Sequence, residues 1–358
     1  MSNRLLSAIG DALALVKQAK VTDATALLQR ALSGKQPESE PAKTNVSPDL
    51  PRRPIGDVVR ALRTGRPAML RTKPAQAPRT LQPGETFAPR QYAGEAGSIG
   101  YWLHVPEGHA KQDLALVLML HGCTQNPQDF AAGTRMNQLG DEHGLVVAYP
   151  HQTRAANANG CWNWFLGRNQ KRGSGEPAVL AGLARSLAAE FGIAPSRIFV
   201  AGLSAGGAMA DILACEYPDV FSAACIHSGL PQGSARDVPS AFAAMNGSAG
   251  FEAKRADGTP GRKIVFNGSC DSTVHPVNGE RIIDGLRGKG AEITSDREVE
   301  GRKVAHTVLQ DGSGRSMAEH WFIHGTGHAW SGGDPAGSYT EAGGPDASRL
   351  MVRFFLET

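Results

Sequence analysis

From about residue 98 onward, apolar runs of strand length alternate with helical patterns. The expected strands are 100–105, 114–120, 145–149, 197–201, 221–227, 263–266 and 321–324. The expected helices are 128–143, 178–191, 205–217, 277–287 and 347–356. Such alternation is typical of a mostly parallel sheet with helices on both faces, so the pattern predicts an α/β fold.

The first part of the chain follows a different pattern. Residues 1–34 carry apolar positions at helical spacing and are expected to form two short amphipathic helices. Ten prolines stand between residues 35 and 90, and strand-like alternation is missing there. The sequence therefore predicts a helical arm over 1–34, a Pro-rich basic linker over 35–97 and the α/β domain over 98–358.

Charge is unevenly distributed along the chain. Residues 1–90 hold 15 Lys and Arg against 7 Asp and Glu, while the whole chain has a formal net charge of +3. These basic residues are scattered without interleaved aromatic side chains, so no nucleic-acid binding is expected. No apolar run approaches the roughly 18 residues of a membrane helix, and no secretory signal is visible. The sequence alone thus indicates a cytoplasmic protein without a membrane span, and it leaves the oligomeric state open.

Cysteine usage argues against a metal centre or a disulfide scaffold. The five cysteines are Cys123, Cys161, Cys215, Cys225 and Cys270. They are too few for a disulfide framework and too far apart for a CxxC metal or redox site, so a zinc site is not expected. Cys225 lies in an apolar run and is expected to be a buried thiol.

The hexapeptide GLSAGG at 202–207 directly follows an expected strand and opens an expected helix. A nucleophile at such an elbow sits in strained backbone, so its neighbours two before and two after must be small, as Gly202 and Gly206 are. The following helix directs its positive end at a developing oxyanion. We therefore interpret Ser204 as a nucleophile rather than as the N-cap of a glycine-rich turn.

A serine nucleophile needs a base, and the base needs an acid that orients it. In α/β-hydrolases the acid follows the serine in a loop after a late strand. Asp271 stands in such a loop after the expected strand 263–266, whereas Asp257 precedes this strand and Asp284 lies in a helical pattern. Asp271 is the expected acid, and an Asx residue that only stabilises a turn is the alternative.

The expected base lies in the segment HWFIHGTGH at 320–328. The spacing of its three histidines suggests metal ligands on one helical face, but glycines break any helix there, so a metal site is disfavoured. His328 follows the expected strand in a Gly-Thr-Gly turn and is the predicted base. His320 and His324 are expected on the strand as ordinary polar or core residues. His275 is the alternative base and is expected instead to line the pocket.

A tetrahedral intermediate also needs two N–H donors at its oxyanion. Ala205, directly after the nucleophile, is expected to supply one backbone N–H. The second donor is expected in the loop after an early strand, where Gly122 permits a tight turn and leaves the N–H of Cys123 as the predicted donor. A plain turn at the end of the strand is the alternative.

Several motifs resemble the poly(3-hydroxybutyrate) depolymerase family of esterases, which is related to feruloyl and acetylxylan esterases. These motifs are LHGCTQN at 120–126, CWNWF at 161–165, GLSAGGAMA at 202–210, YPDVFSA at 217–223, NGSCDSTV at 267–274 and GTGHAWSGG at 325–333. The resemblance implies an α/β-hydrolase fold, ester hydrolysis without a cofactor and a triad of Ser204, Asp271 and His328.

The same resemblance implies further roles. It implies a disulfide between Cys123 and Cys161, and an apolar substrate subsite lined by Trp162, Trp164 and Trp330. It also introduces secretion as an alternative to a cytoplasmic location.

Three functions follow from these observations. The first is a serine ester hydrolase that acts on poly(3-hydroxybutyrate) or short 3-hydroxyalkanoate oligomers through an acyl-enzyme. The second is a feruloyl or acetylxylan esterase with the same chemistry. The third is a hydrolase fold that serves as a non-catalytic binding module, which would predict the loss of a triad residue.

Overall fold

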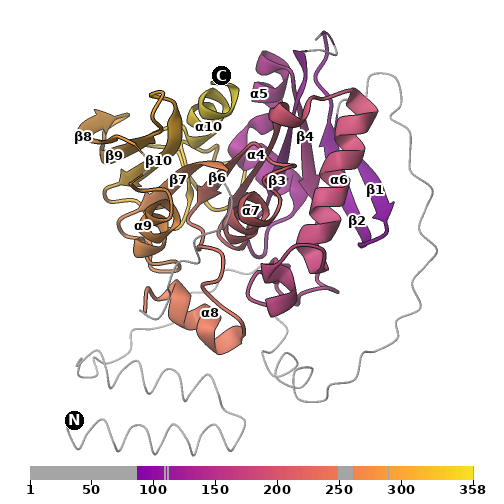
Figure 1. Cartoon of the computed structure of the whole chain (residues 1–358), viewed down its shortest axis with the longest axis horizontal. Coiled ribbons are helices and arrows are strands. Elements are labelled where there is room, and N and C mark those ends of the chain that lie inside the picture. The colour runs from indigo at the N-terminus through magenta and orange to yellow at the C-terminus, as the bar shows by residue number, and fades with distance from the viewer. Residues whose placement is uncertain (1–86, 109, 111–112, 249–260, 289, 358) are drawn as a thin grey trace, which may run out of the picture. The chain divides into compact units, whose positions relative to one another are not determined.

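The computed structural model describes residues 87–357 except 109, 111–112, 249–260 and 289. The helices predicted over 1–34 and most of the predicted linker lie outside the described residues. A ten-stranded sheet forms the centre of the described part, in the order β1-β2-β4-β3-β5-β6-β7-β10-β9-β8 (Figure 1). Its strands are β1 (Phe87–Gly94), β2 (Gly97–His104), β3 (Ala115–Leu120), β4 (Leu145–Pro150), β5 (Ile198–Leu203), β6 (Ala223–His227), β7 (Arg262–Gly268), β8 (Glu292–Val299), β9 (Arg302–Gln310) and β10 (Ser316–Ile323).

The strands in the middle of the sheet, from β4 to β10 in this order, pair in parallel. The strands at the two edges, β1 with β2 and β8 with β9, are antiparallel. Parallel neighbours end at the same edge of the sheet, so the loops after β3, β5, β7 and β10 meet there. A separate small sheet pairs β11 (Trp330–Ser331) with β12 (Thr340–Glu341).

Helices cover both faces of the sheet, as the alternating pattern predicted. They are α4 (Pro127–Thr134), α5 (Met136–His143), α6 (Gly175–Phe191), α7 (Ala205–Glu216), α8 (Val238–Met245), α9 (Val277–Asp284) and α10 (Ala347–Leu356). On β3, Leu116 and Leu118 pack into the cluster that holds α6 and α7, whereas Val117 and Met119 pack into the one that holds α5 and α10. All four side chains are fully buried, so β3 is apolar on both faces.

Several features differ from the sequence-based expectation, among them helix α8, which was not expected. Strand β1 lies inside the predicted linker 35–97, so the domain starts earlier than residue 98. This strand lies at the sheet edge and contains Pro89. Only Ala88 is buried, so the sequence shows no apolar run at this place. The helix predicted over 128–143 is two helices, separated at Arg135 with φ 54°. Strand β8 was missed because it is almost entirely exposed, and β9 was missed because only a minority of its residues are buried.

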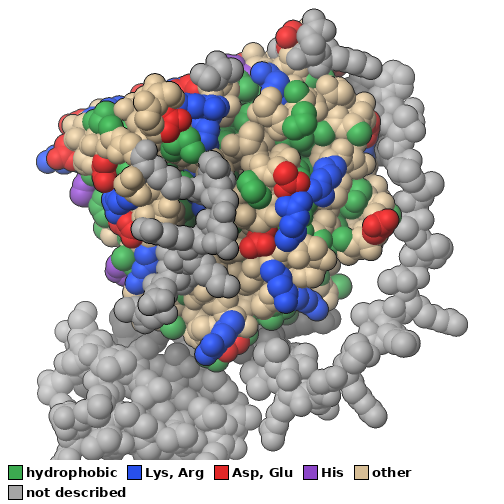
Figure 2. Space-filling view, in the orientation of Figure 1, with side chains coloured by type: hydrophobic (Ala, Val, Ile, Leu, Met, Phe, Trp, Pro, Cys, Tyr) green, Lys and Arg blue, Asp and Glu red, His purple; other side chains and the backbone are tan. Residues whose placement is uncertain are grey.

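Charges of both signs lie interspersed on the face of the molecule drawn in Figure 2. Among the described residues, none of the helices has the length and apolar character needed to cross a bilayer.

Candidate active site

Ser204 occupies the turn between β5 and α7 with φ 58° and ψ −118°. Residues other than glycine rarely adopt such backbone angles. Where they do, contacts with neighbouring groups hold the strained conformation in place. The Ser204 N–H donates to the carbonyl of His227 at 2.9 Å, and the Ser204 carbonyl accepts the Ala208 N–H at 2.9 Å. The turn leaves Ser204 partly exposed at the carboxyl end of β5.

The two glycines of the motif are required by close backbone approaches. A Cβ on Gly202 would lie 2.3 Å from the carbonyl carbon of Gly206. A Cβ on Gly206 would lie 2.0 Å from the carbonyl oxygen of Leu120. No side chain fits at either position, which is the physical reason that small residues were expected around the elbow.

Asp271 and His328 form a hydrogen-bonded pair in which the carboxylate is buried and the imidazole is partly exposed. His328 Nδ1 lies 2.7 Å from Asp271 Oδ2, and the Asp271 side chain is fully shielded from solvent. Asp271 Oδ1 accepts the backbone N–H groups of Thr273 and Val274 at 2.9 and 2.8 Å. Burial raises the pKa of Asp271, but His328 and these two N–H groups outweigh burial and hold the pKa below its usual range. Asp271 thus stabilises its turn through one oxygen and binds His328 through the other.

The loops that carry this pair are bonded to each other beyond the two side chains. The N–H of Ser269 donates to the carbonyl of Ile323 and that of Cys270 to the carbonyl of Thr326, both at 2.9 Å. The Gly325 N–H donates to Ser269 Oγ at 2.9 Å. Because β7 and β10 are parallel neighbours, these bonds fix the acid relative to the base.

His227, at the end of β6, joins the nucleophile to the base segment and was missed from the sequence. Its carbonyl accepts the Ser204 N–H, and its Nε2 accepts the Ser331 N–H at 3.0 Å. Its ring stacks against Trp330, with ring centroids 5.0 Å apart. Burial and the nearby His328 lower the pKa of His227 to about 3, so this imidazole is neutral. The sequence did hold one sign of this role, because His227 ends a buried strand that could be expected to lie next to the strand leading to Ser204.

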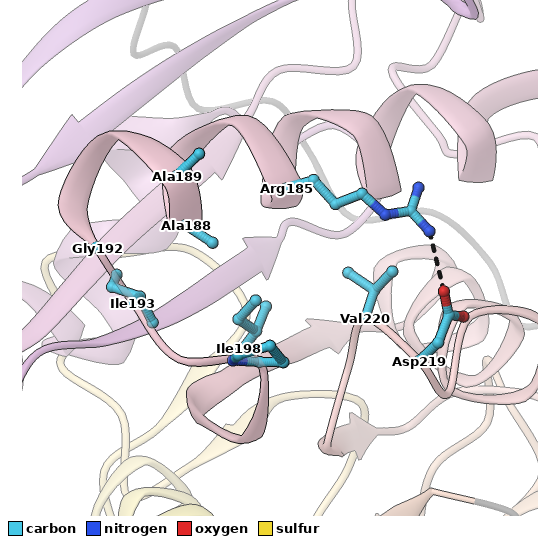
Figure 3. Close-up of a pocket in the computed structure, with 9 residues that line it drawn as sticks. Arg185, Ala188, Ala189, Gly192, Ile193, Ile198, Asp219 and Val220 are labelled. Atoms are coloured by element: carbon cyan, nitrogen blue, oxygen red, sulfur yellow. Dashed lines mark hydrogen bonds and ion pairs between the residues drawn. The ribbon is translucent and has the colours of Figure 1, made fainter.

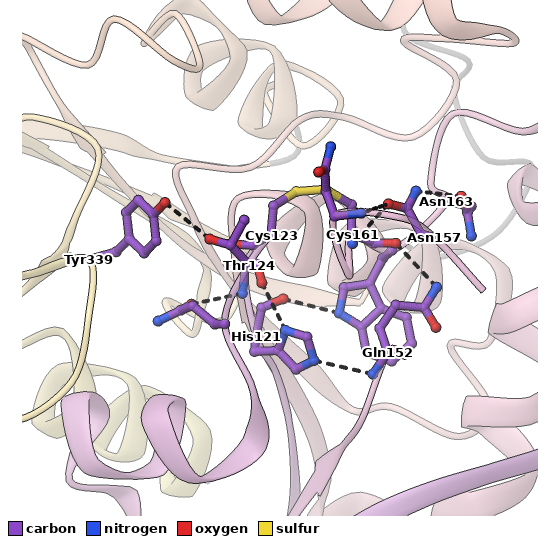
Figure 4. Close-up of a disulfide and its surroundings, with 12 residues drawn as sticks. His121, Cys123, Thr124, Gln152, Asn157, Cys161, Asn163 and Tyr339 are labelled. Atoms are coloured by element: carbon purple, nitrogen blue, oxygen red, sulfur yellow. Dashed lines mark hydrogen bonds between the residues drawn. A yellow bond between two sulfur atoms is a disulfide. The ribbon is translucent and has the colours of Figure 1, made fainter. Parts of the chain in front are cut away.

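The loop after β3 lies against the nucleophile. A Cβ on Gly122 would lie 3.7 Å from Ser204 Cβ. His121 accepts the Gln152 N–H through Nε2 at 3.2 Å, so Nδ1 carries the hydrogen and donates to the Gly122 carbonyl at 2.8 Å (Figure 4). Burial lowers the pKa of His121 to about 4, which keeps the ring neutral. These bonds fix the loop that carries Cys123.

A disulfide joins Cys123 to Cys161 beside this loop (Figure 4). The Asn159 carbonyl accepts the Thr124 N–H at 2.8 Å, so the two segments are also bonded through their backbones. Among the described residues, the Cys123 N–H has no acceptor. Ala205 opens α7, so its N–H has no partner within the helix. Neither of the two N–H groups predicted to bind an oxyanion is therefore engaged by another described residue.

The three tryptophans expected to line a substrate subsite are buried in the protein. Trp162 and Trp330 are 0% and 1% exposed, and Trp164 is 5% exposed. The Trp162 indole donates to the carbonyl of His121 at 3.1 Å, and the Trp330 indole donates to Ser348 Oγ at 3.0 Å. All three side chains are thus packed inside the protein in this structure, and their role in a substrate subsite stays a prediction.

The other three histidines considered in the sequence analysis lie outside the pair formed by His328 and Asp271. His275 is exposed, and its N–H donates to the carbonyl of Met245 at the end of α8. His320 is buried on β10 between Glu280 and Asn267, 3.1 and 3.2 Å away, as a polar core residue. His324 is exposed just after β10.

Among the described residues, no group of three or more His, Cys, Asp or Glu side chains is arranged to hold a metal ion. Cys225 is fully buried, as predicted.

A pocket of about 410 Å³ lies at the other end of β5. Figure 3 shows the residues that line it. It is lined by Ile198 at the amino end of β5, and by residues of α6 and the loop before β6, where Arg185 pairs with Asp219. Ser204 follows the opposite end of the same strand, about 20 Å away at 3.3 Å per residue. This pocket is thus separate from the candidate active site.

Comparisons with known proteins agree with this geometry. The chain is 32% identical to poly(3-hydroxyalkanoate) depolymerase C of Paucimonas lemoignei, over 65% of the chain and 58% of that protein. It is 29% identical to poly(3-hydroxybutyrate) depolymerase of Ralstonia pickettii, over 71% of the chain and 57% of that protein. The chain therefore spans less than two thirds of the length of either depolymerase. Probable acetylxylan esterase A of Aspergillus clavatus is 24% identical over 64% of the chain and 79% of that protein.

A solved structure and a family model complete the comparison. The acetyl xylan esterase from Aspergillus awamori superimposes with a TM-score of 0.57 at 21% identity, covering 67% of this chain and 94% of that one, which shows the shared α/β-hydrolase fold. The model of the esterase PHB depolymerase family matches residues 99–283, a range that includes Ser204 and Asp271. With just over half of its length matched, the chain belongs to the esterase PHB depolymerase family.

Proposed function

We propose that the protein is a serine hydrolase of carboxylic esters. The observation that carries the proposal is the strained Ser204 elbow at the same sheet edge as the 2.7 Å pair of His328 and Asp271. A hydroxyl after β5, a buried carboxylate after β7 and an imidazole after β10 lie at one edge of the sheet. These three groups are the parts that acyl transfer requires. The esterase and depolymerase names of the relatives support the same reaction class.

In this mechanism Ser204 Oγ attacks the ester carbonyl carbon while His328 accepts the hydroxyl proton. Asp271 engages Nδ1 of His328, so Nε2 is the nitrogen that takes the proton, and the carboxylate stabilises the imidazolium. The N–H groups of Cys123 and Ala205 bind the oxyanion. When the tetrahedral intermediate collapses, the alcohol leaves with the proton from His328. Water then attacks the acyl-enzyme by the same route and releases the acid.

We propose poly(3-hydroxybutyrate) or short 3-hydroxyalkanoate oligomers as the substrate. The support is the order of similarity, because two bacterial depolymerases are more similar in sequence than the acetylxylan esterases. Esters of acetylated xylan are the second candidate, favoured by the fold shared with the Aspergillus awamori enzyme.

A turnover panel tests both levels of the proposal. It comprises p-nitrophenyl esters of increasing chain length, 3-hydroxybutyrate oligomers, emulsified polymer, acetylated xylan and methyl ferulate, each with Ser204→Ala as the blank. Turnover of at least one ester that Ser204→Ala lacks is expected. Higher kcat/KM on hydroxybutyrate oligomers than on the xylan and ferulate esters supports hydroxyalkanoates as the substrate. Higher kcat/KM on the xylan or ferulate esters would instead assign those esters as the substrate. No turnover of any ester would contradict the proposed reaction.

A further inference from the structure

Gln125 connects the loop after β3 to the segment that follows His328. Gln125 as a whole is only 6% exposed. Oε1 accepts the Gly122 N–H at 2.9 Å, while Nε2 donates to the Ser338 carbonyl at 2.9 Å and to Asp129 Oδ2 at 3.0 Å. We call this set of four residues the Gln125 bridge. The amide has acceptor and donor partners on opposite sides, so its orientation is fixed.

Asp129 completes the bridge from the first turn of α4. Its Oδ1 accepts the Ser338 N–H at 2.9 Å, and its Oδ2 accepts the Ser338 hydroxyl at 2.6 Å. Ser338 is therefore bound through its N–H and its hydroxyl by Asp129, and through its carbonyl by Gln125. Bonds to an ionised carboxylate are stronger than bonds between neutral groups. The bridge holds two loops that are more than 200 residues apart in sequence.

Strained backbone flanks the bridge on both sides. Thr124 has φ 66° and Tyr339 has φ 54°, although neither is glycine. Their side-chain oxygens lie 3.2 Å apart, as the dashed line in Figure 4 shows. Such conformations persist where surrounding contacts determine them. Each strained residue directly adjoins a member of the bridge, so the bridge supplies contacts that hold them.

We propose that Gln125 is a positioning residue for the oxyanion site, an inference that rests on the proposed function. Gln125 fixes the Gly122 N–H, and the next N–H along the chain is that of Cys123, the proposed oxyanion donor. A Cβ on Gly122 would lie 3.1 Å from Gln125 Oε1 and 3.7 Å from Ser204 Cβ. The amide thus acts on backbone directly beside the nucleophile. Because an oxyanion donor is effective only when it is preorganised, the orientation of this loop determines kcat.

The test compares Gln125→Glu with Gln138→Glu in the full chain. Gln125→Glu keeps an acceptor for Gly122 but loses both N–H donors and places a carboxylate against Asp129. Gln138 is exposed on α5, and its side chain donates to Glu142 at 3.0 Å. Gln138→Glu therefore also places one carboxylate beside another, but away from the site. The measurements are kcat and KM on p-nitrophenyl butyrate per titrated active site, and the affinity of an alkylboronic acid that forms a tetrahedral adduct with the serine.

For Gln125→Glu we expect kcat to fall by roughly tenfold or more, because a misplaced oxyanion donor acts on the transition state. KM should stay within about threefold, since ground-state binding does not use the donor. Boronic acid affinity should fall by a factor similar to that of kcat, and Gln138→Glu should match the wild type.

A wild-type kcat per active site in folded Gln125→Glu overturns the proposal, even if its melting temperature is lower. If that variant does not fold, Asp129→Asn is used instead. The side-chain NH2 group of asparagine would then face the hydrogen-bond donors of Gln125 and Ser338. The same separation of kcat from KM is expected, and wild-type kcat in that variant also overturns the proposal. Wild-type protein that is inactive on every ester contradicts the proposed function instead, so the two failures are distinguishable.

Discussion

His227 Nε2 accepts the backbone N–H of Ser331 at 3.0 Å, three residues after the proposed base. The carbonyl of the same histidine accepts the N–H of Ser204. One buried residue therefore bonds to the nucleophile elbow with its backbone and to the base segment with its side chain. This arrangement requires a neutral ring, because only an unprotonated Nε2 can accept a hydrogen bond.

Acid should destabilise the fold through this ring and through His121. Their pKa values in the folded protein are lowered from 6.5 to about 3 and about 4. The unfolded chain binds protons on both residues below pH 6.5, and the folded protein does not until the pH nears those lower values. Their contribution to stability is therefore full above pH 6.5 and is lost as the pH falls towards 4 and then 3.

Urea unfolding between pH 7 and pH 4.5 measures this effect. We expect the free energy of unfolding to fall with decreasing pH, and to fall less steeply in His227→Gln, which can still accept the Ser331 N–H. An identical pH slope in the variant would show that His227 is not the titrating group.

Ser204→Ala should lower ester turnover by about 10⁴-fold or more, because no other nucleophile stands at the elbow. The melting temperature should change little, since Ser204 is partly exposed and its hydrogen bonds to His227 and Ala208 are made by its backbone. Kinetics on p-nitrophenyl butyrate and a thermal melt check both expectations. Ser196→Ala, at an exposed serine, is the control and should keep full activity. Substantial residual activity in Ser204→Ala would assign the nucleophile elsewhere.

Asp271→Asn should reduce kcat by several orders of magnitude. An amide can still accept the turn N–H groups of Thr273 and Val274 through its oxygen, but it then presents N–H to His328 and favours the wrong tautomer. The same change at the triad acid of a serine protease costs about 10⁴ in kcat for this reason. Asp284→Asn, on the exposed surface of α9, is the matched control. Greater harm from Asp284→Asn than from Asp271→Asn would exclude Asp271 as the acid.

Gly206→Ala should prevent formation of the elbow. Its methyl group would lie 2.0 Å from the Leu120 carbonyl oxygen, which is backbone and cannot rotate away. We expect loss of soluble protein or of activity. Gly312→Ala is the control, because nothing lies within 4 Å of its added Cβ. An active, stable Gly206→Ala enzyme would show that β3 and the elbow are not this close.

The sequence predicted those parts of the fold that depend on local pattern. The apolar runs identified the buried parallel strands, and Ala347–Leu356 was placed to the residue because its apolar face has helical spacing. Strand β8 could not be found this way, because an exposed edge strand has no apolar run. The candidate triad followed from motifs at strand ends. His227 and Gln125 were missed because their roles depend on contacts with Ser331 and Ser338, more than 100 residues away, which no local pattern records.

The bond between Cys123 and Cys161 makes the proposed chemistry depend on the redox state of the surroundings. Disulfides persist in oxidising compartments and are reduced by cytosolic thiols. In this fold the bond adjoins the N–H proposed to bind the oxyanion. Reduction would remove this covalent constraint and leave the loop held by its hydrogen bonds, such as that from the Thr124 N–H to the Asn159 carbonyl. The same polypeptide would thus be a more effective catalyst where thiols are oxidised than where they are kept reduced.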